Sequence, residues 1–351
     1  MQSLQHTLFT DVADFYGKLL ASLQQAEESI HLIYFAFDSG EWADKIGDLL
    51  QEKASSGVAV HLMVDEIGMA VDNLRNAYRN RVLLSRLQAG GVQVDLFRPA
   101  GRRLSQFNRL HVKVCAVDQG TVLMGGSNIG DHYLGWRDTN ICLKGDFGDT
   151  FARLYGYLRQ FSSLNATRGT TAQANPQLDL PVQDASLLLT VPGRRQDIRR
   201  TLLELILEAE RSVNIRSWYF LPDPEILNAL LSQAERGIDV TVLFSDRTRV
   251  PFIDAANRLV AHKLAQSGVC VQRYRGRYMH AKEAWNDKGQ ILFGSANIDP
   301  WALGSNFECD LQLHDSALAQ QLQQALYADR DNCVGWNFVR PWQPAFSGFR
   351  L

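Results

Sequence analysis

The stretch AEESIHLIYF at residues 26–35 returns later in the chain as AERSVNIRSWYF at residues 209–220. Each copy begins with residues typical of a helix end and continues as a run of β-branched and aromatic residues, which is typical of a strand. A repeat of this kind predicts two copies of one structural unit. We therefore expect the 351 residues to fold as two related halves.

Glycines mark the same points in both halves. A helical stretch ends at Gly57 and at Gly237, and the signal recurs at Gly91 and Gly268, each time before alternating β-branched residues. Such a glycine indicates a helix C-cap that leads into a strand. The sequence thus predicts an α/β fold of two pseudo-symmetric halves. Each half is a β-α-β-α-β run with a further hairpin, forming a mixed sheet with helices on both faces.

A polar segment without periodicity separates the two halves and predicts a linker. We place the N-terminal half at residues 1–163, the linker at 164–185 and the C-terminal half at 186–351.

Each half carries the same set of polar residues at matching spacing. The first set is His111-Val112-Lys113, Asp118 and Gly125-Gly126-Ser127-Asn128, and the second is His280-Ala281-Lys282, Asp287 and Gly294-Ser295-Ala296-Asn297. Histidine and lysine two positions apart on a strand project from one face. The duplication at one point of a repeat predicts two halves of a single active site at the interface between the halves.

A hairpin with an Asp-x-Gly turn follows each histidine and lysine. Folding it about Gln119 is expected to bring Ser127 and Asn128 beside His111, and the second hairpin does the same for His280. An imidazole, an ammonium and a carboxamide suit a phosphodiester, because lysine and asparagine donate to its oxygens while histidine attacks or moves protons. The predicted phosphate ligands are Lys113, Lys282, Asn128, Asn297, Ser127 and Ser295.

Asp118 and Asp287 belong to the catalytic motif, but both stand at the turn and at an odd offset from the histidines. We expect them to hold the hairpins rather than to touch substrate. Four other histidines lack a comparable neighbourhood and are expected to be ordinary core residues: His31, His61, His262 and His314.

Composition limits the partners. The net charge of −2 gives no global field for nucleic acid, although arginine clusters near the motifs suit an anionic substrate. Neither acidic clusters nor paired histidines stand at metal-ligand spacing, so the sequence predicts no metal and no cofactor. Five widely spaced cysteines predict reduced thiols.

The sequence contains no run of the ~18 apolar residues that a membrane-spanning helix needs, and its N-terminus lacks signal-peptide features. We expect a cytoplasmic protein that is peripheral to the cytoplasmic face of the membrane. Irregularly spaced aromatic residues near the C-terminus fit either interfacial membrane contact or packing over the core: Trp336, Phe338, Trp342, Phe346 and Phe349.

The paired His-x-Lys-x4-Asp motifs resemble those of the phospholipase D superfamily, and the resemblance spans nearly the whole chain. A finer similarity is to bacterial cardiolipin synthases. It rests on residues 125–131 (GGSNIGD), 136–139 (WRDT), 219–223 (YFLPD), 294–300 (GSANIDP) and 306–308 (NFE).

The resemblance implies a phosphatidyltransferase. His111 would attack phosphorus to form a phosphohistidine, and His280 would protonate the leaving alcohol and later deprotonate the acceptor; the near-symmetry fits either order. Asp138 and Glu308 would orient the histidines. Donor and acceptor would both be phosphatidylglycerol, giving cardiolipin and glycerol.

Two features depart from the family pattern. Many relatives carry two N-terminal membrane helices that this sequence lacks, so it resembles the shorter members. Gly126 stands where the superfamily motif has serine, although Ser127 follows. A phospholipase D hydrolase or a nuclease on the same scaffold stays an alternative. A catalytically inactive lipid-binding protein is a third interpretation, against which the two intact half-sites argue. The sequence does not indicate an oligomeric state.

Overall fold

The computed structural model describes residues 4–100, 107–164, 178, 180 and 185–336. The N-terminal half contains β1 (Gln5–Phe9), α1 (Val12–Gln24), β2 (Ser29–Tyr34), α2 (Glu41–Ser55), β3 (Ala59–Asp65), α3 (Gly68–Val71), η1 (Leu74–Asn76), α4 (Ala77–Ala89), β4 (Gln93–Phe97), β5 (Lys113–Val117), β6 (Thr121–Gly125), η3 (Asp131–Gly135), β7 (Asn140–Lys144) and α5 (Thr150–Arg159). The C-terminal half contains β8 (Ala185–Val191), β9 (Arg195–Gln196), α6 (Asp197–Glu208), β10 (Ser212–Ser217), α7 (Pro224–Glu235), β11 (Asp239–Ser245), α8 (Pro251–Gln266), β12 (Cys270–Tyr274), β13 (Glu283–Asn286), β14 (Gln290–Gly294), α9 (Pro300–Gly304), β15 (Glu308–His314), α10 (Ser316–Ala328), η4 (Arg330–Asn332) and β16 (Cys333–Gly335).

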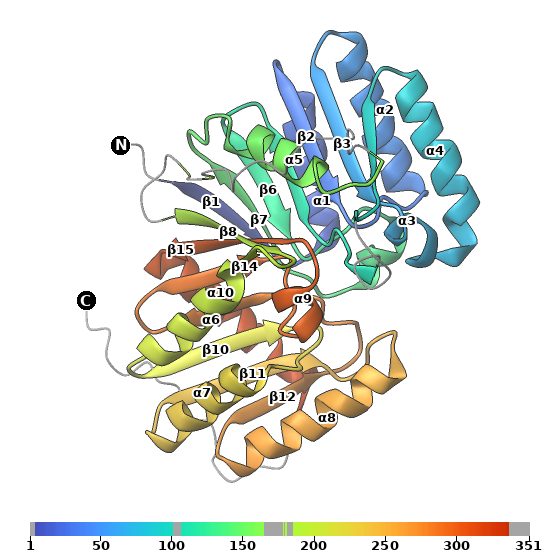
Figure 1. The fold of residues 1–351 in the computed structure, drawn as a ribbon. Helices are drawn as coiled ribbons and strands as arrows, with labels where there is room; N and C mark the ends of the chain where they lie inside the picture. Colours follow the sequence, from blue (N-terminus) through green and yellow to red (C-terminus); the bar gives the residue numbers. More distant parts are fainter. Residues whose placement is uncertain (1–3, 101–106, 165–177, 179, 181–184, 337–351) are drawn as a thin grey trace.

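Each half forms one mixed sheet, and the two sheets follow the same plan (Figure 1). The first sheet has the order β1-β7-β6-β5-β2-β3-β4, and the second has β16-β12-β11-β10-β13-β14-β15-β8-β9. In both, three parallel strands joined by helices lie beside an antiparallel meander that starts at the His-x-Lys motif. The predicted α/β fold of two repeated halves is confirmed.

The four glycines that predicted helix ends are in the left-handed conformation. Their φ angles are +97° at Gly57, +91° at Gly91, +86° at Gly237 and +87° at Gly268. Glycine reaches this region without a Cβ clash, so each helix stops there and the chain turns directly into β3, β4, β11 or β12. The repeat therefore positions corresponding strands, and the residues at their ends, in the same way in both halves.

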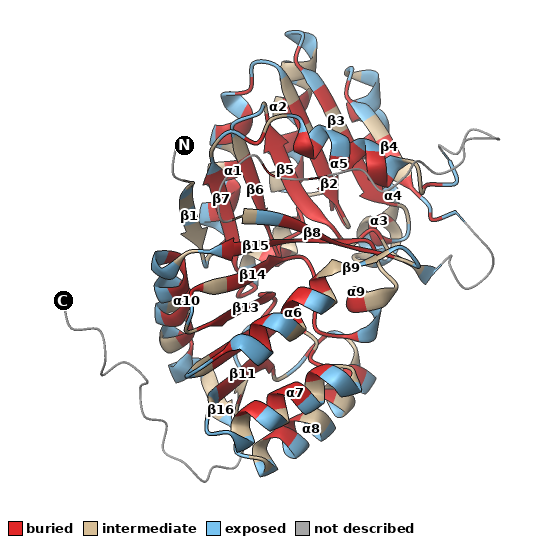
Figure 2. Cartoon of the chain, turned by 60° about the vertical axis from the view of Figure 1, so that its left-hand side comes forward, coloured by how far each residue is buried: buried red, intermediate tan, exposed pale blue. Residues whose placement is uncertain are grey.

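The two halves share a central hydrophobic core. Side chains of the first sheet such as Val114 and Ile141 belong to one buried cluster with Phe293 and Leu311 of the second sheet. Two further clusters lie under the outer helices, α1, α2 and α4 in one half and α6, α7 and α8 in the other. Figure 2 shows the buried strands between these partly exposed helices. Burial of apolar surface between the sheets fixes the halves against each other.

Two predictions concern segments that are largely beyond the described part of the chain. The linker at 164–185 and the exact boundaries of the halves stay predictions. Of the C-terminal aromatic residues, Trp336 lies with its ring 4.6 Å from the Arg273 guanidinium, and the other four are outside the described residues. No helix within the described ranges is long and apolar enough to cross a membrane.

Candidate active site

The two motif histidines lie where the halves meet, and short backbone bridges between the halves hold them there. Before the first histidine, Leu110 pairs in parallel with Phe307, and the His111 amide donates to the Phe307 carbonyl over 2.8 Å. The second half mirrors this contact. The His280 amide donates to the Arg137 carbonyl over 2.7 Å. Each histidine is therefore anchored by the backbone of the opposite half.

The carboxylates also cross between the halves. The Nδ1 atom of His111 lies 3.0 Å from the Glu308 carboxylate, and Nδ1 of His280 lies 2.8 Å from Oδ2 of Asp138. Both carboxylates are fully buried. A carboxylate on Nδ1 fixes the ring and its tautomer and leaves Nε2 free for chemistry. The structure thus brings the two predicted histidines and both predicted orienting carboxylates together, in a crossed arrangement that the sequence did not indicate.

Both motif lysines are buried in the same site. Nζ of Lys113 donates to the His111 carbonyl over 2.8 Å, and Nζ of Lys282 donates to the His280 carbonyl. These side chains are only 1% and 2% exposed. Each ammonium therefore has further N–H groups available for an anion between the histidines.

An aromatic side chain flanks each half-site. The Phe35 ring lies 5.3 Å from the His111 ring, and the Trp218 ring lies 4.6 Å from the His280 ring. Phe35 and Trp218 occupy equivalent positions of the sequence repeat. Their place in the repeat was the signal by which they could have been recognised as site residues. They exclude water on one side of each histidine, which strengthens the local electrostatics.

The serines contact the carboxylates rather than open space. The Ser127 hydroxyl donates to Asp138 over 3.0 Å, and the Ser295 hydroxyl donates to Glu308 over 2.6 Å. Ser127 was expected beside His111, but its hydroxyl is bonded to the carboxylate that holds His280. The register of the hairpin predicted that Ser127 lies beside His111. Its link to His280 arises because Asp138 reaches across to the other half, which the register does not encode.

Gly126 explains why the serine of this motif stands at position 127, one residue after its place in the superfamily motif. A Cβ at Gly126 would lie 2.0 Å from Oδ1 of Asp138 and 2.7 Å from the His280 carbonyl oxygen. No side chain fits there, so the next residue, Ser127, makes the contact with the carboxylate. The departure from the superfamily pattern therefore leaves the hydrogen bond in place.

The two motif asparagines have different surroundings. Oδ1 of Asn128 accepts from the Ala36 amide over 3.2 Å, and its Nδ2 donates to the Tyr133 hydroxyl over 3.1 Å. Asn297 is buried with an Oδ1 atom that has no hydrogen-bond partner among the described residues. Asn128 thus supports the loop, whereas Asn297 keeps polar capacity for a bound molecule. Both remain predicted phosphate ligands.

The motif aspartates lie at the far ends of their hairpins. Oδ1 of Asp118 accepts from the Glu28 and Ser29 amides over 2.8 and 2.9 Å. Asp287 accepts from the Arg211 and Ser212 amides at 3.0 and 3.1 Å. These contacts tie the hairpin to the start of β2 or β10 and favour the structural role that we predict for both residues.

Burial dominates the electrostatics of the site. It lowers the pKa of His111 and of His280 well below the usual range, and the two lysines lower both further. Burial also lowers the pKa of Lys113 to about 7 and that of Lys282 to about 8. The same effect raises the pKa of Asp138 to about 6 and that of Glu308 to about 8. Neutral imidazoles at physiological pH suit a nucleophile or a general base.

A buried ionic network supports the second half-site and was missed from the sequence. Arg137, next to Asp138, donates to Asp329 over 2.8 and 2.9 Å. Asp329 also accepts from Arg216 over 2.8 Å, and Arg216 pairs with Glu283 beside Lys282. The equivalent positions in the first half, Ile33 and Val114, are apolar. Only the docked halves reveal this asymmetry.

The remaining histidines differ in part from expectation. His31 and His61 stack on each other with their rings 4.7 Å apart. The expectation that His262 and His314 are core residues is wrong, because both are exposed on the surface. His132 was not singled out. It lies 3.3 Å from Asp38 and 3.2 Å from Asp72.

His132 is a cation at neutral pH. Burial lowers the pKa of His132, but its imidazole N–H groups donate to the Asp38 and Asp72 carboxylates, and these interactions outweigh burial and raise the pKa to about 9. It directly follows the Gly-Ser-Asn-Ile-Gly-Asp segment, which was the available signal.

A family model described as the phospholipase D-like domain of cardiolipin synthase matches residues 19–152 and 202–330. The chain belongs to this family. It is 30% identical to the cardiolipin synthase of Geobacillus thermodenitrificans, covering 97% of this chain and 69% of that protein. Cardiolipin synthase 1 of Staphylococcus epidermidis is 29% identical over 92% of this chain and 67% of its own length. The chain spans about two thirds of these relatives.

The fold of this family member also matches a solved structure. The phosphatidylserine synthase of Haemophilus influenzae superposes with a TM-score of 0.75 and 17% identity, covering 95% of this chain and 87% of that one. Together the matches confirm the predicted membership of the phospholipase D superfamily and the class of cardiolipin synthase-like phosphatidyltransferases.

Proposed function

We propose that this chain transfers the phosphatidyl group of one phosphatidylglycerol to a second, forming cardiolipin and releasing glycerol. The crossed pairs of His111 with Glu308 and His280 with Asp138 carry the proposal. They support a site in which two imidazoles and two lysine ammonium groups surround one phosphodiester and stabilise the charge that develops on it.

The first step forms a covalent intermediate. Nε2 of His111 attacks phosphorus, and the bond between phosphorus and the glycerol oxygen breaks. His280 enters this step as an imidazolium, because the bound phosphodiester anion favours its charged form, and its Nε2–H gives the proton to that oxygen while Nδ1–H stays on Asp138. Lys113 and Lys282 stabilise the charge on the phosphoryl oxygens. Glu308 holds the ring of His111 while it takes on positive character, because Nδ1–H donates to the carboxylate.

The second step transfers the group. A hydroxyl of the acceptor phosphatidylglycerol gives its proton to His280 and attacks phosphorus, and the bond between phosphorus and His111 breaks. Water at the same position would give phosphatidic acid, which is the hydrolase alternative. The near-neutral chain charge of −2 disfavours a nuclease.

We also propose peripheral contact with the cytoplasmic face of a membrane. Val71 and Leu74 are 50% and 75% exposed beside Asp72, and Phe252 is 67% exposed beside Arg249. Arg249 lies 3.3 Å from Asp72, so the segments of the two halves that carry these apolar side chains meet at one ion pair. Five free cysteines fit a reducing compartment.

Labelled substrate tests the function. Purified protein is incubated with phosphatidylglycerol carrying radiolabel in its terminal glycerol, and lipid and water-soluble products are separated. Transfer leaves half of the consumed label in cardiolipin and half in glycerol, whereas hydrolysis puts all of it in glycerol. His111→Ala and His280→Ala should abolish turnover, and the exposed control His262→Ala should not. Metal-independent DNA cleavage without lipid turnover would refute the proposal.

Membrane contact is tested by flotation with phosphatidylglycerol vesicles. Leu74→Glu and Phe252→Glu should reduce vesicle binding while sparing turnover of a short-chain, micellar substrate. Leu207→Glu changes a residue that is 50% exposed on α6 and serves as the matched control. Equal loss of binding in all three variants would contradict the assigned surface.

A further inference from the structure

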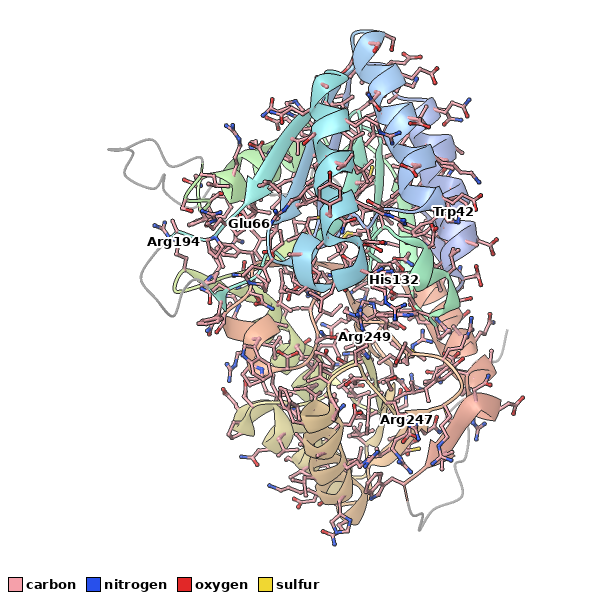
Figure 3. The ribbon with its side chains drawn as sticks, turned by 90° about the vertical axis from the view of Figure 1, so that its right-hand side faces the viewer. Trp42, Glu66, His132, Arg194, Arg247 and Arg249 are labelled. Carbon is pink, nitrogen blue, oxygen red and sulfur yellow. The ribbon has the colours of Figure 1, made fainter. Side chains whose placement is uncertain are left out.

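A polar cavity of about 730 Å³ lies beside the His280 half-site. Its walls include Arg247, Arg275 and Arg277 from the C-terminal half and His132 and Trp136 from the N-terminal half. Figure 3 shows His132 and Arg247 on one side of the molecule, above and below Arg249 where the two halves meet. The cavity is therefore built by both halves, like the active site.

Aromatic rings separate this cavity from the catalytic histidine. The Trp136 ring lies 4.9 Å from the His280 ring and 5.2 Å from the Tyr278 ring, and both Trp136 and Tyr278 line the cavity. The far side of Trp136 is thus in contact with the imidazole. A molecule in the cavity would lie one side-chain width from His280.

The cavity carries an excess of positive charge. Asp246 is its acidic residue among the lining side chains, and it is already engaged by Arg273 at 2.6 Å and Arg275 at 3.1 Å. The side chains of Arg247 and Arg277 are exposed and make no ion pair with any residue in the described ranges. Two guanidinium groups are therefore free to bind an anion in bidentate geometry.

We propose that this cavity binds the phosphodiester of the acceptor phospholipid, and this inference rests on the proposed transferase function. An acceptor phosphatidylglycerol carries its own phosphate three carbons away from the hydroxyl that attacks. When that hydroxyl reaches His280, its phosphate must lie close by, and the arginine-lined cavity is there to receive it. A neutral acceptor such as water or glycerol has no group that would use the cavity.

The position of the cavity gives the donor phosphate and the acceptor phosphate different binding places. The phosphate of the donor lies between the histidines and the two buried lysines, whereas the phosphate of the acceptor lies beyond Trp136. The nearly symmetric catalytic residues would thus bind substrates in an asymmetric way. Arg247 and Arg277 act as specificity residues that favour an anionic lipid acceptor over water.

The test compares two acceptors in one double variant, which carries both Arg247→Gln and Arg277→Gln. Cardiolipin formation should need at least tenfold more phosphatidylglycerol for half-maximal rate. Transfer of the donor phosphatidyl group to a neutral alcohol, with release of glycerol, should be unchanged when it is measured at saturating ethanol as phosphatidylethanol formation. Arg258→Gln removes an exposed charge on α8 outside the cavity lining and should affect neither reaction. Lysine at both positions should restore part of the selectivity.

A soluble headgroup without acyl chains tests binding to the cavity separately from attraction of the protein to a lipid surface. Glycerophosphoglycerol should inhibit cardiolipin formation in the wild type and much less in the double variant. Equal losses with ethanol and with phosphatidylglycerol, or inhibition unchanged by the double substitution, would overturn the inference. A wild-type protein that makes phosphatidylethanol but no cardiolipin would instead contradict the proposed function.

Discussion

The Nδ1 atom of His111 lies 3.0 Å from the carboxylate of Glu308, a residue of the other half of the chain. The reciprocal contact joins His280 to Asp138. Each motif histidine is paired with a carboxylate of the opposite half, so the candidate site is complete only when the halves are docked. This crossing explains why two nearly identical motifs give one site.

Removal of a crossing carboxylate should disable the histidine of the opposite half. Glu308→Gln and Asp138→Asn keep the side-chain shape but offer an amide in place of the carboxylate, so the imidazole loses its ionic partner and its tautomer is no longer fixed. We expect turnover to fall by about 100-fold or more in each variant. Phosphatidyl transfer rates check this, with the exposed Glu52→Gln as control. A fall of less than threefold in both would contradict the assigned roles.

Gly126 should tolerate no side chain. Gly126→Ala puts a Cβ 2.0 Å from Oδ1 of Asp138, so that carboxylate must move away from His280. We expect a loss of activity comparable to that of Asp138→Asn. Gly156→Ala is the matched control, because a Cβ there meets nothing within 4 Å. If Gly126→Ala retains wild-type activity, the carboxylate is not held as described.

The sequence predicted the repeat, the strands and the motif residues because these depend on local patterns. Gly57 and Gly91 follow from helix caps, and His111 and Lys113 follow from a two-residue strand period. The crossing of Glu308 to His111 depends on how two complete sheets dock, and no local pattern encodes that.

Anion binding at the lysines should weaken as pH rises. Burial lowers the pKa of Lys113 to about 7 and that of Lys282 to about 8, so both ammonium groups are charged at pH 6 and largely neutral at pH 9. An anion binds the charged form, hence affinity is lost at high pH, by at most about tenfold per pH unit for each lysine that deprotonates. Calorimetric titration with sulfate, which stays a dianion over this range, measures the effect at constant ionic strength.

Lysine variants show which residue causes the pH dependence of sulfate affinity. Lys113→Met should reduce the change of sulfate affinity with pH. Lys45→Met, on the exposed face of α2, should leave that change as it is in the wild type. Sulfate affinity that is constant from pH 6 to pH 9 in the wild type would show that the lysines do not bind the anion.

The ion pairs of His132 should make stability depend on pH. Its pKa is raised to about 9 in the folded protein, above the unfolded value near 6.5, so their contribution is complete below about pH 6.5 and is lost as pH rises through about 9. We expect His132→Gln to reduce the free energy of unfolding by about 1–2 kcal/mol at pH 6, since partial exposure screens the pairs. Denaturant unfolding at pH 6 and pH 9.5 checks that the difference disappears.

His132 also shows where sequence reasoning was incomplete. The sequence offers no sign that Asp38 and Asp72, some 60 or more residues upstream, converge on it. The exposed His262 shows the opposite error, since a general preference for buried strand histidines does not apply to a residue on the outer face of α8. Both outcomes depend on packing rather than on local sequence.

The number of covalent intermediates per chain tests the central claim most directly. Rapid quenching with donor lipid labelled at phosphorus, followed by peptide mapping, counts the phosphohistidines and locates them. A single site shared by the halves predicts at most one label per chain in the wild type, on His111, and no turnover in either histidine variant. Two labels per chain, or half of the activity left in His111→Ala or His280→Ala, would mean two independent sites and would contradict the account.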